Sequence, residues 1–425
     1  MKALDSLRLS RALAPSLAAL ALCASADAQA LLTKFYGEDT SDYLGSSVAI
    51  SGDLAVLGAP NAHGSAFSGD GAAYVLRRSP SGWPSLISHP AVTEIAPTAS
   101  IYNETFGASV AIHGALIVVG QPEFNSSATV IDNGAAHVFR DTPAGVVLEG
   151  DLVPSASTSA RAGEAVAAFQ GRVAVGAPSD FSMPTTPGEV YIYLRAPTAP
   201  HWPGPEAVLT APGGAVGDRF GFSVALEGSR CIVGAPGRAS LGAHTGAAYV
   251  FVRSGGLWVL EAELAPLAPV AGSYFGVGVD ILGDYAVVGA HMEDAVYVFR
   301  RSATSGWEQV QRLAGPDSTA TESFGRTVAL DGDRLAVGAS NANAVHVFQR
   351  VSPLDYRMKQ RFHERYTDAL GFSVDLSGED LLAGAPLDDG AGASAGAAHF
   401  YASPTFVAML GFGAEGLCPC SNDDP

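Results

Sequence analysis

The feature that most constrains this chain is a seven-fold internal repeat. Each copy has a valine preceded by a glycine three positions earlier and followed by a glycine ten positions later, and the copies recur about every 54 residues. The valines are Val48, Val110, Val166, Val224, Val279, Val328 and Val374. Such regularity predicts seven copies of one structural unit, packed so that each copy covers the apolar faces of its neighbours.

Each copy has the pattern of a small antiparallel sheet. In the first copy, the apolar run 47–50 is followed by the turn dipeptide Gly52-Asp53 and a second apolar run, 54–57. A loop rich in Gly and Ser leads to a third run, 72–76, and a more polar segment completes the unit. Four strands in each of seven copies predict an all-β fold, a seven-bladed β-propeller of four-stranded antiparallel blades.

Two further features indicate a closed ring. The residue before each repeat valine is small, as expected where seven strands crowd about one axis: Ser47, Ser109, Ala165, Ser223, Gly278, Thr327 and Ser373. The seventh copy lacks an evident fourth strand after Tyr401, and the N-terminal segment 32–35 has a suitable pattern. We therefore expect this segment to be the outer strand of the last blade and to close the ring.

The repeat resembles the FG-GAP family. The segments FGASVA (106–111) with VGQP (119–122), and FGFSVA (220–225) with VGAP (233–236), carry the resemblance, which extends over residues 31–401. FG-GAP repeats build the seven-bladed propeller of integrin α-subunit heads and of many bacterial surface proteins. The resemblance implies an extracellular interaction module whose ligands dock on one face of the disk. It is specific for fold and says less about function.

The N-terminal region has the pattern of a secretory signal. Residues 1–30 combine basic residues, an apolar run and a small-residue segment, which predicts cleavage after Ala28 or Ala30 and a secreted or cell-surface protein. Lipidation at Cys23 is a weaker alternative, because the bulky Leu22 precedes it.

The rest of the chain divides into a propeller at 31–403 and a tail at 404–425. In the tail, Cys418 and Cys420 are too close for an unstrained intramolecular disulfide, which leaves intermolecular pairing or a truncated C-terminal module open. Cys231 lies in an apolar run and is predicted to be a buried small hydrophobe.

Composition excludes several classes of protein. With 48% hydrophobic and 16% charged residues the chain is not disordered, and its net charge of −18 argues against a nucleic-acid partner. After the signal, no apolar run approaches the length of a membrane span. We expect a monomeric propeller with an extracellular protein or carbohydrate ligand.

The sequence predicts no metal and no cofactor. Calcium needs six to eight oxygen ligands, and many FG-GAP proteins supply them from an Asp-rich loop between the first two strands. Here that connection is a minimal turn in every copy, and its richest version, 331–333, offers two carboxylates. A hairpin turn is the better interpretation.

The residue types typical of catalysis also follow the repeat. His137, His346 and His399 occupy a third-strand position that holds Tyr in other copies, which indicates a structural ring. The Gly-x-Ser serines recur in several copies, whereas a catalytic serine is singular, so no catalytic residue is assigned.

Two aspartates depart from the repeat and are candidates for the central channel. The residue after the repeat valine is Ala in five copies but Asp280 and Asp375 in the other two. A carboxylate on an inner strand needs water or hydrogen-bond donors. One interpretation is a contact with channel water or turn amides, and the other is a polar ligand or ion in the channel.

The loops between the second and third strands predict where a ligand docks, because function on a repeat scaffold concentrates where the copies differ. They are long in copies one to four and seven (61–71, 123–134, 179–188, 237–246 and 387–396), and short in copies five and six. In a closed ring the long loops form one contiguous arc. The predicted contacts on it are Phe67, Asp70, Phe124, Asp132, Phe181, His244, Asp388 and Asp389.

These observations favour a non-catalytic binding or adhesion module for protein or glycan ligands. Two alternatives remain open: an extracellular propeller hydrolase or lyase with a site in the axial channel, and a structural component of an envelope or matrix.

Overall fold

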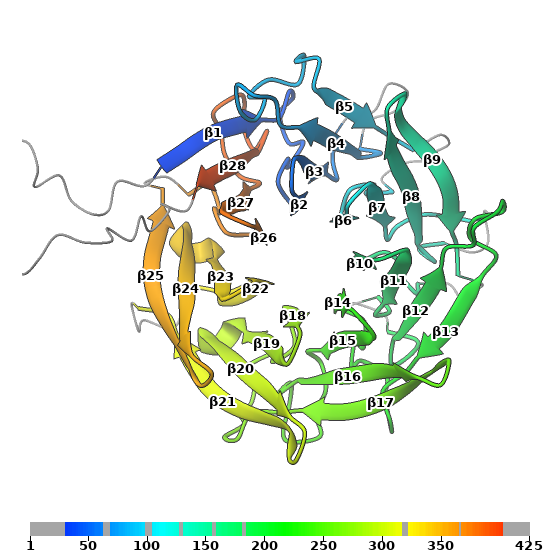
Figure 1. Ribbon diagram of the computed structural model, residues 1–425, viewed down its shortest axis with the longest axis vertical. Helices are drawn as coiled ribbons and strands as arrows, with labels where there is room; N and C mark the ends of the chain where they lie inside the picture. The colour runs from blue at the N-terminus through cyan, green and yellow to red at the C-terminus, as the bar shows by residue number, and fades with distance from the viewer. Residues whose placement is uncertain are drawn as a thin grey trace, which may run out of the picture.

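The computed structural model describes residues 30–62, 69–97, 104–126, 131–154, 159–180, 184–316, 322–364 and 367–402. Within these residues, seven four-stranded antiparallel sheets are arranged as blades around a central axis (Figure 1). The predicted fold class, an all-β seven-bladed propeller, is confirmed.

Each blade takes its strands in chain order from the axis outward. Blade 1 has β2 (Ser47–Ser51), β3 (Leu54–Ala59), β4 (Ala72–Arg77) and β5 (Val92–Ile95), and blade 2 has β6 (Ser109–His113), β7 (Leu116–Gln121), β8 (Ala135–Thr142) and β9 (Gly145–Leu152). Blade 3 has β10 (Ala165–Phe169), β11 (Arg172–Ala177), β12 (Glu189–Leu194) and β13 (Pro205–Leu209), and blade 4 has β14 (Ser223–Glu227), β15 (Arg230–Ala235), β16 (Ala247–Ser254) and β17 (Leu257–Leu264). Blade 5 has β18 (Val279–Leu282), β19 (Tyr285–Ala290), β20 (Ala295–Ser302) and β21 (Gly306–Ala314), and blade 6 has β22 (Phe324–Asp331), β23 (Arg334–Ala339), β24 (Ala344–Ser352) and β25 (Asp355–His363). Blade 7 has β26 (Ser373–Ser377), β27 (Asp380–Ala385), β28 (Ala397–Ala402) and, from the other end of the chain, β1 (Ala30–Tyr36).

The N-terminal strand closes the ring as predicted. β1 pairs antiparallel with β28, with Phe35 opposite Ala398, and becomes the outer strand of blade 7 (Figure 1). Strands from both ends of the described chain therefore share one sheet.

Burial follows position along the blade. Every residue of β7, the second strand of its blade, is buried, because sheets of the neighbouring blades pack on both of its faces. The outer strand β17 consists of exposed and partly buried residues, except for the buried Leu264 at its end. The predicted contrast between apolar inner runs and half-polar outer strands is therefore observed.

The small residues before the repeat valines join one blade to the next. The hydroxyl of Ser223 in blade 4 donates a hydrogen bond to the carbonyl oxygen of Gly276, which precedes blade 5, at 2.8 Å. The Ser373 hydroxyl makes the same bond at 2.8 Å to the Gly45 carbonyl and so links blade 7 to blade 1. Ser47, Ser109 and Thr327 form equivalent bonds. The Gly-x-Ser pattern is thus a structural joint, repeated wherever a hydroxyl is present.

The repeat glycines allow the backbones of adjacent blades to approach closely at this junction. A β-carbon at Gly384 would lie 1.9 Å from the carbonyl oxygen of Gly45 in the next blade, which is far inside van der Waals contact. The same holds for all seven glycines at the penultimate position of the second strands, whose β-carbons would lie 1.8 to 2.1 Å from the following blade. The partner Gly45 has φ +86°, a conformation that favours glycine. The ten-residue separation in the sequence therefore reflects one backbone contact made seven times.

Carboxylates on the outer strands provide a second set of inter-blade contacts. Glu149 on β9 binds Arg140 of its own blade and Arg195 of blade 3, with Glu149 Oε2 2.8 Å from Arg195 Nε. Hydrogen bonds from Arg195 and Arg140 lower the pKa of Glu149 to about 2, against the effect of its burial. Glu206 and Glu261 each bridge two arginines of adjacent blades in the same manner.

The third-strand position shared by Tyr and His is structural, as predicted. His137 lies 2.7 Å from both Asp151 and Gln121 through its two ring nitrogens. His346 is fully buried with its ring 5.3 Å from that of Phe324, and Tyr249 packs on Phe220 in the same way at 5.5 Å. An amphipathic ring fits here because one side packs on Phe and the edge finds a polar partner.

Some predictions concern residues that the structure does not describe. The signal segment before Ala30, and the tail with Cys418 and Cys420, lie outside the described residues. Cys231 is described, buried and free, and burial raises the pKa of its thiol, so its prediction as a small hydrophobe is confirmed. Within the described part of the chain, no helix has the length and apolar character needed to span a membrane.

Candidate ligand-binding face and axial pocket

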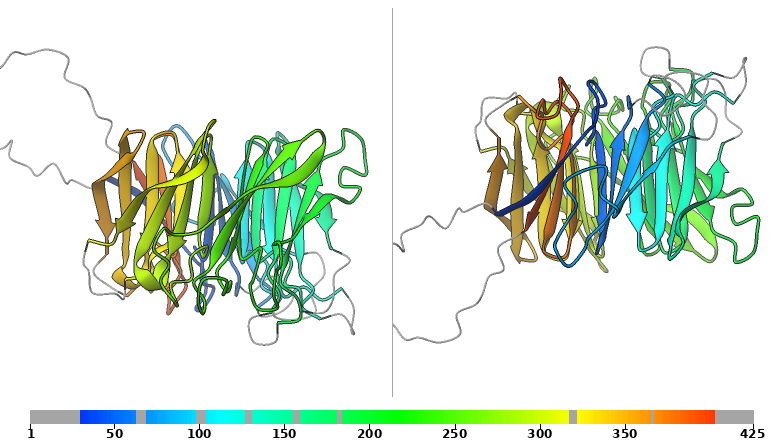
Figure 2. Two further views of the ribbon diagram at one scale, coloured as in Figure 1. Left: turned by 90° about the horizontal axis from the view of Figure 1, so that it is seen from below. Right: turned by 90° about the horizontal axis from the view of Figure 1, so that it is seen from above.

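One face of the disk carries all seven connections between second and third strands. Each inner strand starts at this face, turns at the opposite one, and returns through the second strand, so the longer loops and the 3-10 helices emerge together (Figure 2). We call it the loop face. The inner turns at the opposite face, such as Gly52-Asp53 between β2 and β3, have two residues, as predicted.

Loop length divides the loop face into two sectors. In blades 5 and 6 the connections are reduced to the 3-10 helices η1 (His291–Glu293) and η2 (Ser340–Ala342). The other five connections span 60–71, 122–134, 178–188, 236–246 and 386–396. Because blade 7 adjoins blade 1 in the closed ring, the five longer loops form one arc, which confirms the predicted arrangement of loop lengths.

The structure gives the predicted contact residues on this arc different degrees of exposure. His244 and Asp389 are exposed, and the His244 ring stacks on Tyr274 with centroids 5.4 Å apart. Phe124 is half-buried with its ring 6.3 Å from that of His137, and Asp132 is half-buried in a left-handed turn. Phe67 and Phe181 lie outside the described residues.

Two of the predicted contacts are not on the surface. Asp70 is 3% exposed and Asp388 is 5% exposed, which contradicts the expectation that their carboxylates face a partner. Asp388 Oδ1 accepts a hydrogen bond from the backbone of Gly390 at 2.7 Å. Its other oxygen lies 3.9 Å from Lys34 Nζ. An aspartate in a Gly-rich loop often satisfies backbone amides of its own loop, and composition alone does not distinguish that role from an exposed one.

The channel aspartates link blades by accepting backbone hydrogen bonds. Asp280 Oδ2 accepts from the amide of Leu330 in blade 6 at 2.6 Å, and Oδ1 accepts from Ile281 at 2.8 Å. Asp375 does the same across the ring closure, with Ile50 of blade 1 at 2.7 Å. These bonds support the interpretation as a contact with backbone amides, which here belong to the strands.

The backbone hydrogen bonds offset only part of the free-energy cost of burying these two carboxyl groups. Burial raises the pKa of Asp280 to about 7 and that of Asp375 to about 7, although the amide hydrogen bonds act in the opposite direction. The neutral form of each carboxyl group is therefore favoured over a wider pH range than in an exposed aspartate.

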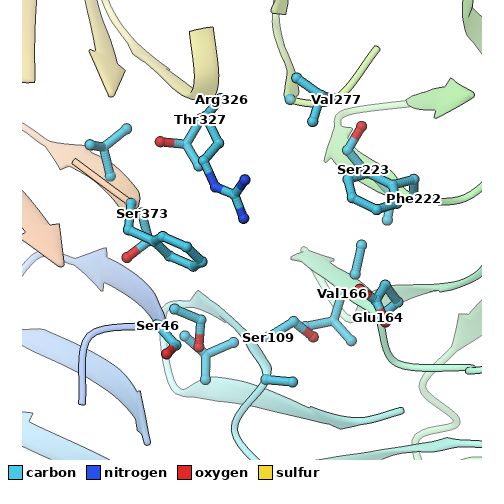
Figure 3. A pocket seen from close by; sticks show the side chains of 18 of the residues that line it. Ser46, Ser109, Glu164, Val166, Phe222, Ser223, Val277, Arg326, Thr327 and Ser373 are labelled. Carbon is cyan, nitrogen blue, oxygen red and sulfur yellow. The ribbon is translucent and has the colours of Figure 1, made fainter. Parts of the chain in front are cut away.

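A pocket lies on the axis and opens at the loop face, and the sequence analysis, which considered an axial site, did not identify the residues at its mouth. It has a volume of about 270 Å³ and is lined by three successive residues from every inner strand or its approach (Figure 3). The seven repeat valines line it furthest from the face, and the small residues form the next ring. The ring nearest the face consists of the residues that precede the small ones: Ser46, Ala108, Glu164, Phe222, Val277, Arg326 and Phe372. We call this set the mouth ring.

The mouth ring differs from copy to copy, and Arg326 is its only cation. The Arg326 guanidinium lies over the ring of Phe372, with its central carbon 4.3 Å from the ring centroid. Figure 3 shows the guanidinium extending into the pocket, with Glu164 across from it. Burial lowers the pKa of His291 to about 4, and the nearby charge of Arg326 acts in the same direction.

Glu164, on the other side of the mouth, is already paired. Its Oε2 lies 3.1 Å from Arg161 Nε. A second hollow of about 410 Å³ adjoins the pocket there, shares Glu164 and Phe222 with it, and is also lined by Arg161, Asp180 and Arg219. The accessible space thus runs from the axis toward blades 3 and 4, below the arc of longer loops.

The residues at the inner turns do not fit a calcium ion. Asp331 Oδ2 accepts a hydrogen bond from the Gly378 amide at 2.6 Å, and Asp333 is paired with Arg350. Both carboxylates of the richest turn are therefore engaged, and a two-residue turn cannot surround an ion. Among the described residues, no group of three or more His, Cys, Asp or Glu side chains is placed to hold a metal.

Together, the ring of blades and the pocket at one end of its axis define a seven-bladed β-propeller with a variable loop face. Four segments, 36–76, 204–251, 258–299 and 307–348, match the family model described as FG-GAP repeat. The chain thus contains FG-GAP repeats. The matched segments cover strands of blades 1, 4, 5 and 6 and the outer strand β13 of blade 3, and all seven blades have four strands and the same glycine contact with the next blade. A search of curated proteins returned no match for this chain.

Proposed function

We propose that this protein is a secreted or cell-surface binding module that holds an extracellular protein or carbohydrate ligand on its loop face, without a catalytic role. The observation that carries the proposal is the division of that face into a contiguous arc of five longer loops beside two minimal connections. A purely structural ring needs no such asymmetry, because the blades contact one another through strands and joints that are alike in all seven copies.

Three further features support the proposal. Repeats of this family are typical of binding modules. The pocket on the axis opens within the same face and extends toward the arc, so a ligand on the loops could also reach the interior. The N-terminal signal pattern would place the protein outside the cell.

The test is to shorten the arc without disturbing the blades. Replacing the connections of blades 1 and 2 with the four-residue connection 340–343 of blade 6 removes part of the arc, and the melting temperature should stay near that of the wild type because strand ends are unchanged. Binding would be measured on a glycan array and on a panel of immobilised extracellular proteins. We expect the variant to lose the binding that the wild type shows.

The matched control exchanges one short connection for the other, placing the sequence of 340–343 at 291–294 in blade 5. This variant alters sequence but not loop length and should bind as the wild type does. Unchanged affinity of the shortened variant would show that the loop arc is not the binding surface.

A further inference from the structure

The strongest unexplained feature of the loop face is the arginine in its axial pocket. Among the described residues, no carboxylate lies within ion-pair distance of the Arg326 guanidinium, which is held by the Phe372 ring instead. The chain has 42 acidic residues against 24 basic ones, so carboxylates are in excess. Other arginines at blade junctions, such as Arg195 and Arg301, bind a glutamate. A guanidinium is always charged and presents donors that match a carboxylate.

The remaining polar groups of the pocket are mostly acceptors. The hydroxyl hydrogens of Ser109, Ser223 and Ser373 are already donated to backbone carbonyls, which leaves their oxygen lone pairs available. Ser46 donates to the carbonyl of Tyr43 in the same way, and Glu164 adds carboxylate oxygens. The pocket therefore suits a ligand with many O–H donors and one acidic group, rather than a peptide end, which also brings carbonyl acceptors.

The size and apolar lining of the pocket fit one sugar ring. About 270 Å³ lies just below the range typical of pockets for drug-sized molecules. Phe222 and Phe372 provide aromatic surface at the mouth, and the repeat valines provide apolar surface beneath. Aromatic surface beside hydrogen-bond acceptors suits the C–H faces and hydroxyl groups of a sugar.

We propose that the axial pocket binds a single acidic sugar residue of the hexuronate type, with its carboxylate on Arg326 and its hydroxyls donating to the serine oxygens and Glu164. The inference names a ligand chemistry for the loop face and to that extent rests on the proposed function. A terminal or branching uronate of a polysaccharide would enter the pocket while the rest of the chain lies across the loops.

The experiment is titration of the folded protein with D-glucuronate and D-galacturonate, followed by calorimetry and by chemical-shift changes. D-glucose and methyl glucuronate test the need for the carboxylate, and N-acetylglycine tests a peptide-type carboxylate. Arg326→Gln removes the cation, and Arg326→Lys keeps a charge without the fork of donors. The matched control is Arg357→Gln, because Arg357 is exposed on β25 and distant from the pocket lining.

We expect one of the two uronates to bind the wild type and the Arg357 variant equally, and to lose about tenfold or more in affinity with Arg326→Gln, with the ester or with glucose. The affinity of Arg326→Lys should lie between those of the wild type and Arg326→Gln. A melting temperature equal to that of the wild type would show that this variant has lost binding and not folding. Equal binding by Arg326→Gln, equal binding of N-acetylglycine, or no uronate binding at about 20 mM would each overturn the proposal.

Failure of this inference can be distinguished from failure of the proposed function. If the shortened-loop variant loses macromolecular binding and no uronate binds the wild type, the proposed binding function is supported and the uronate site is refuted. If uronates bind through Arg326 but shortening the loops does not change macromolecular binding, the uronate site is supported and the loop arc is refuted as the binding surface.

Discussion

Two rings of residues, adjacent in the sequence, behave in opposite ways in this propeller. The residues before the repeat valines are small in all seven copies, and five of them bond the next blade through a hydroxyl. The mouth ring, one position earlier, includes Ala108, Glu164, Phe222 and Arg326. In those five copies the first ring bonds the backbone of the next blade, whereas the second ring faces the opening of the pocket. Positions that keep one kind of residue in this chain therefore make the backbone contacts between blades, and the positions that vary line the mouth of the pocket.

The largest expected effect comes from breaking the uniform joint at a glycine. Gly384→Ala would place a β-carbon 1.9 Å from the Gly45 carbonyl oxygen, and backbone atoms cannot yield cheaply. We expect a loss of more than about 3 kcal/mol in the free energy of unfolding, measured by urea denaturation.

The control for this substitution is Gly228→Ala. Gly228 lies in an inner turn with φ +59°, and a β-carbon there meets nothing within 4 Å. Only the cost of the left-handed backbone remains, which is about 1 kcal/mol. Similar losses for the two variants would refute the close-contact explanation of the repeat.

A second prediction concerns the residues that follow the repeat valines. This position holds Ala in five copies and Asp in two, and the two aspartates have a structural role. The folded-state pKa values of Asp280 and Asp375 are raised to about 7, above those of the unfolded chain, so the folded protein binds more protons between pH 4 and 7. Stability from these groups is therefore greatest at low pH and falls as the pH rises through this window, then levels off.

Replacing both residues by Asn removes this titration. The stability of the wild type relative to the double variant should fall by at least about 1 kcal/mol from pH 4 to pH 8, because each unit of pKa shift corresponds to about 1.4 kcal/mol. Taking the difference cancels the opposite contribution of His291, whose pKa is lowered to about 4. Denaturant midpoints across the pH range measure it, and a flat difference curve would mean that the two carboxylates are solvated.

The smallest expected effect comes from substitutions at two adjacent positions of blade 2, one in the ring of small residues and one in the mouth ring. Ser109→Ala removes the hydrogen bond to the Gly163 carbonyl, which is 2.7 Å long, and should cost about 1 kcal/mol. The neighbouring change Ala108→Ser, in the mouth ring, places there the residue type that blade 1 has at Ser46 and should alter stability by less than about 0.5 kcal/mol. Chemical denaturation of both variants decides the comparison, and a larger loss for Ala108→Ser would reverse it.

The sequence determined the parts of this protein that depend on periodicity. The seven glycine–valine–glycine spacings predicted the blades, the missing strand after Tyr401 predicted closure by the N-terminal segment, and the loop lengths predicted the arc. These features could be derived because a strand needs an alternating or apolar pattern and a joint repeated seven times leaves the same residue at each position.

Only the tertiary structure decided the direction and the neighbours of single side chains. It buried Asp70 and Asp388, gave Asp280 a backbone partner 50 residues away, and brought Arg326 and Glu164 to one opening. The axial pocket takes three successive residues from each blade, so residues from different blades are about 54 positions apart and share no local pattern. Local sequence fixes where each strand begins, but the chemistry at the axis arises only when seven strands converge.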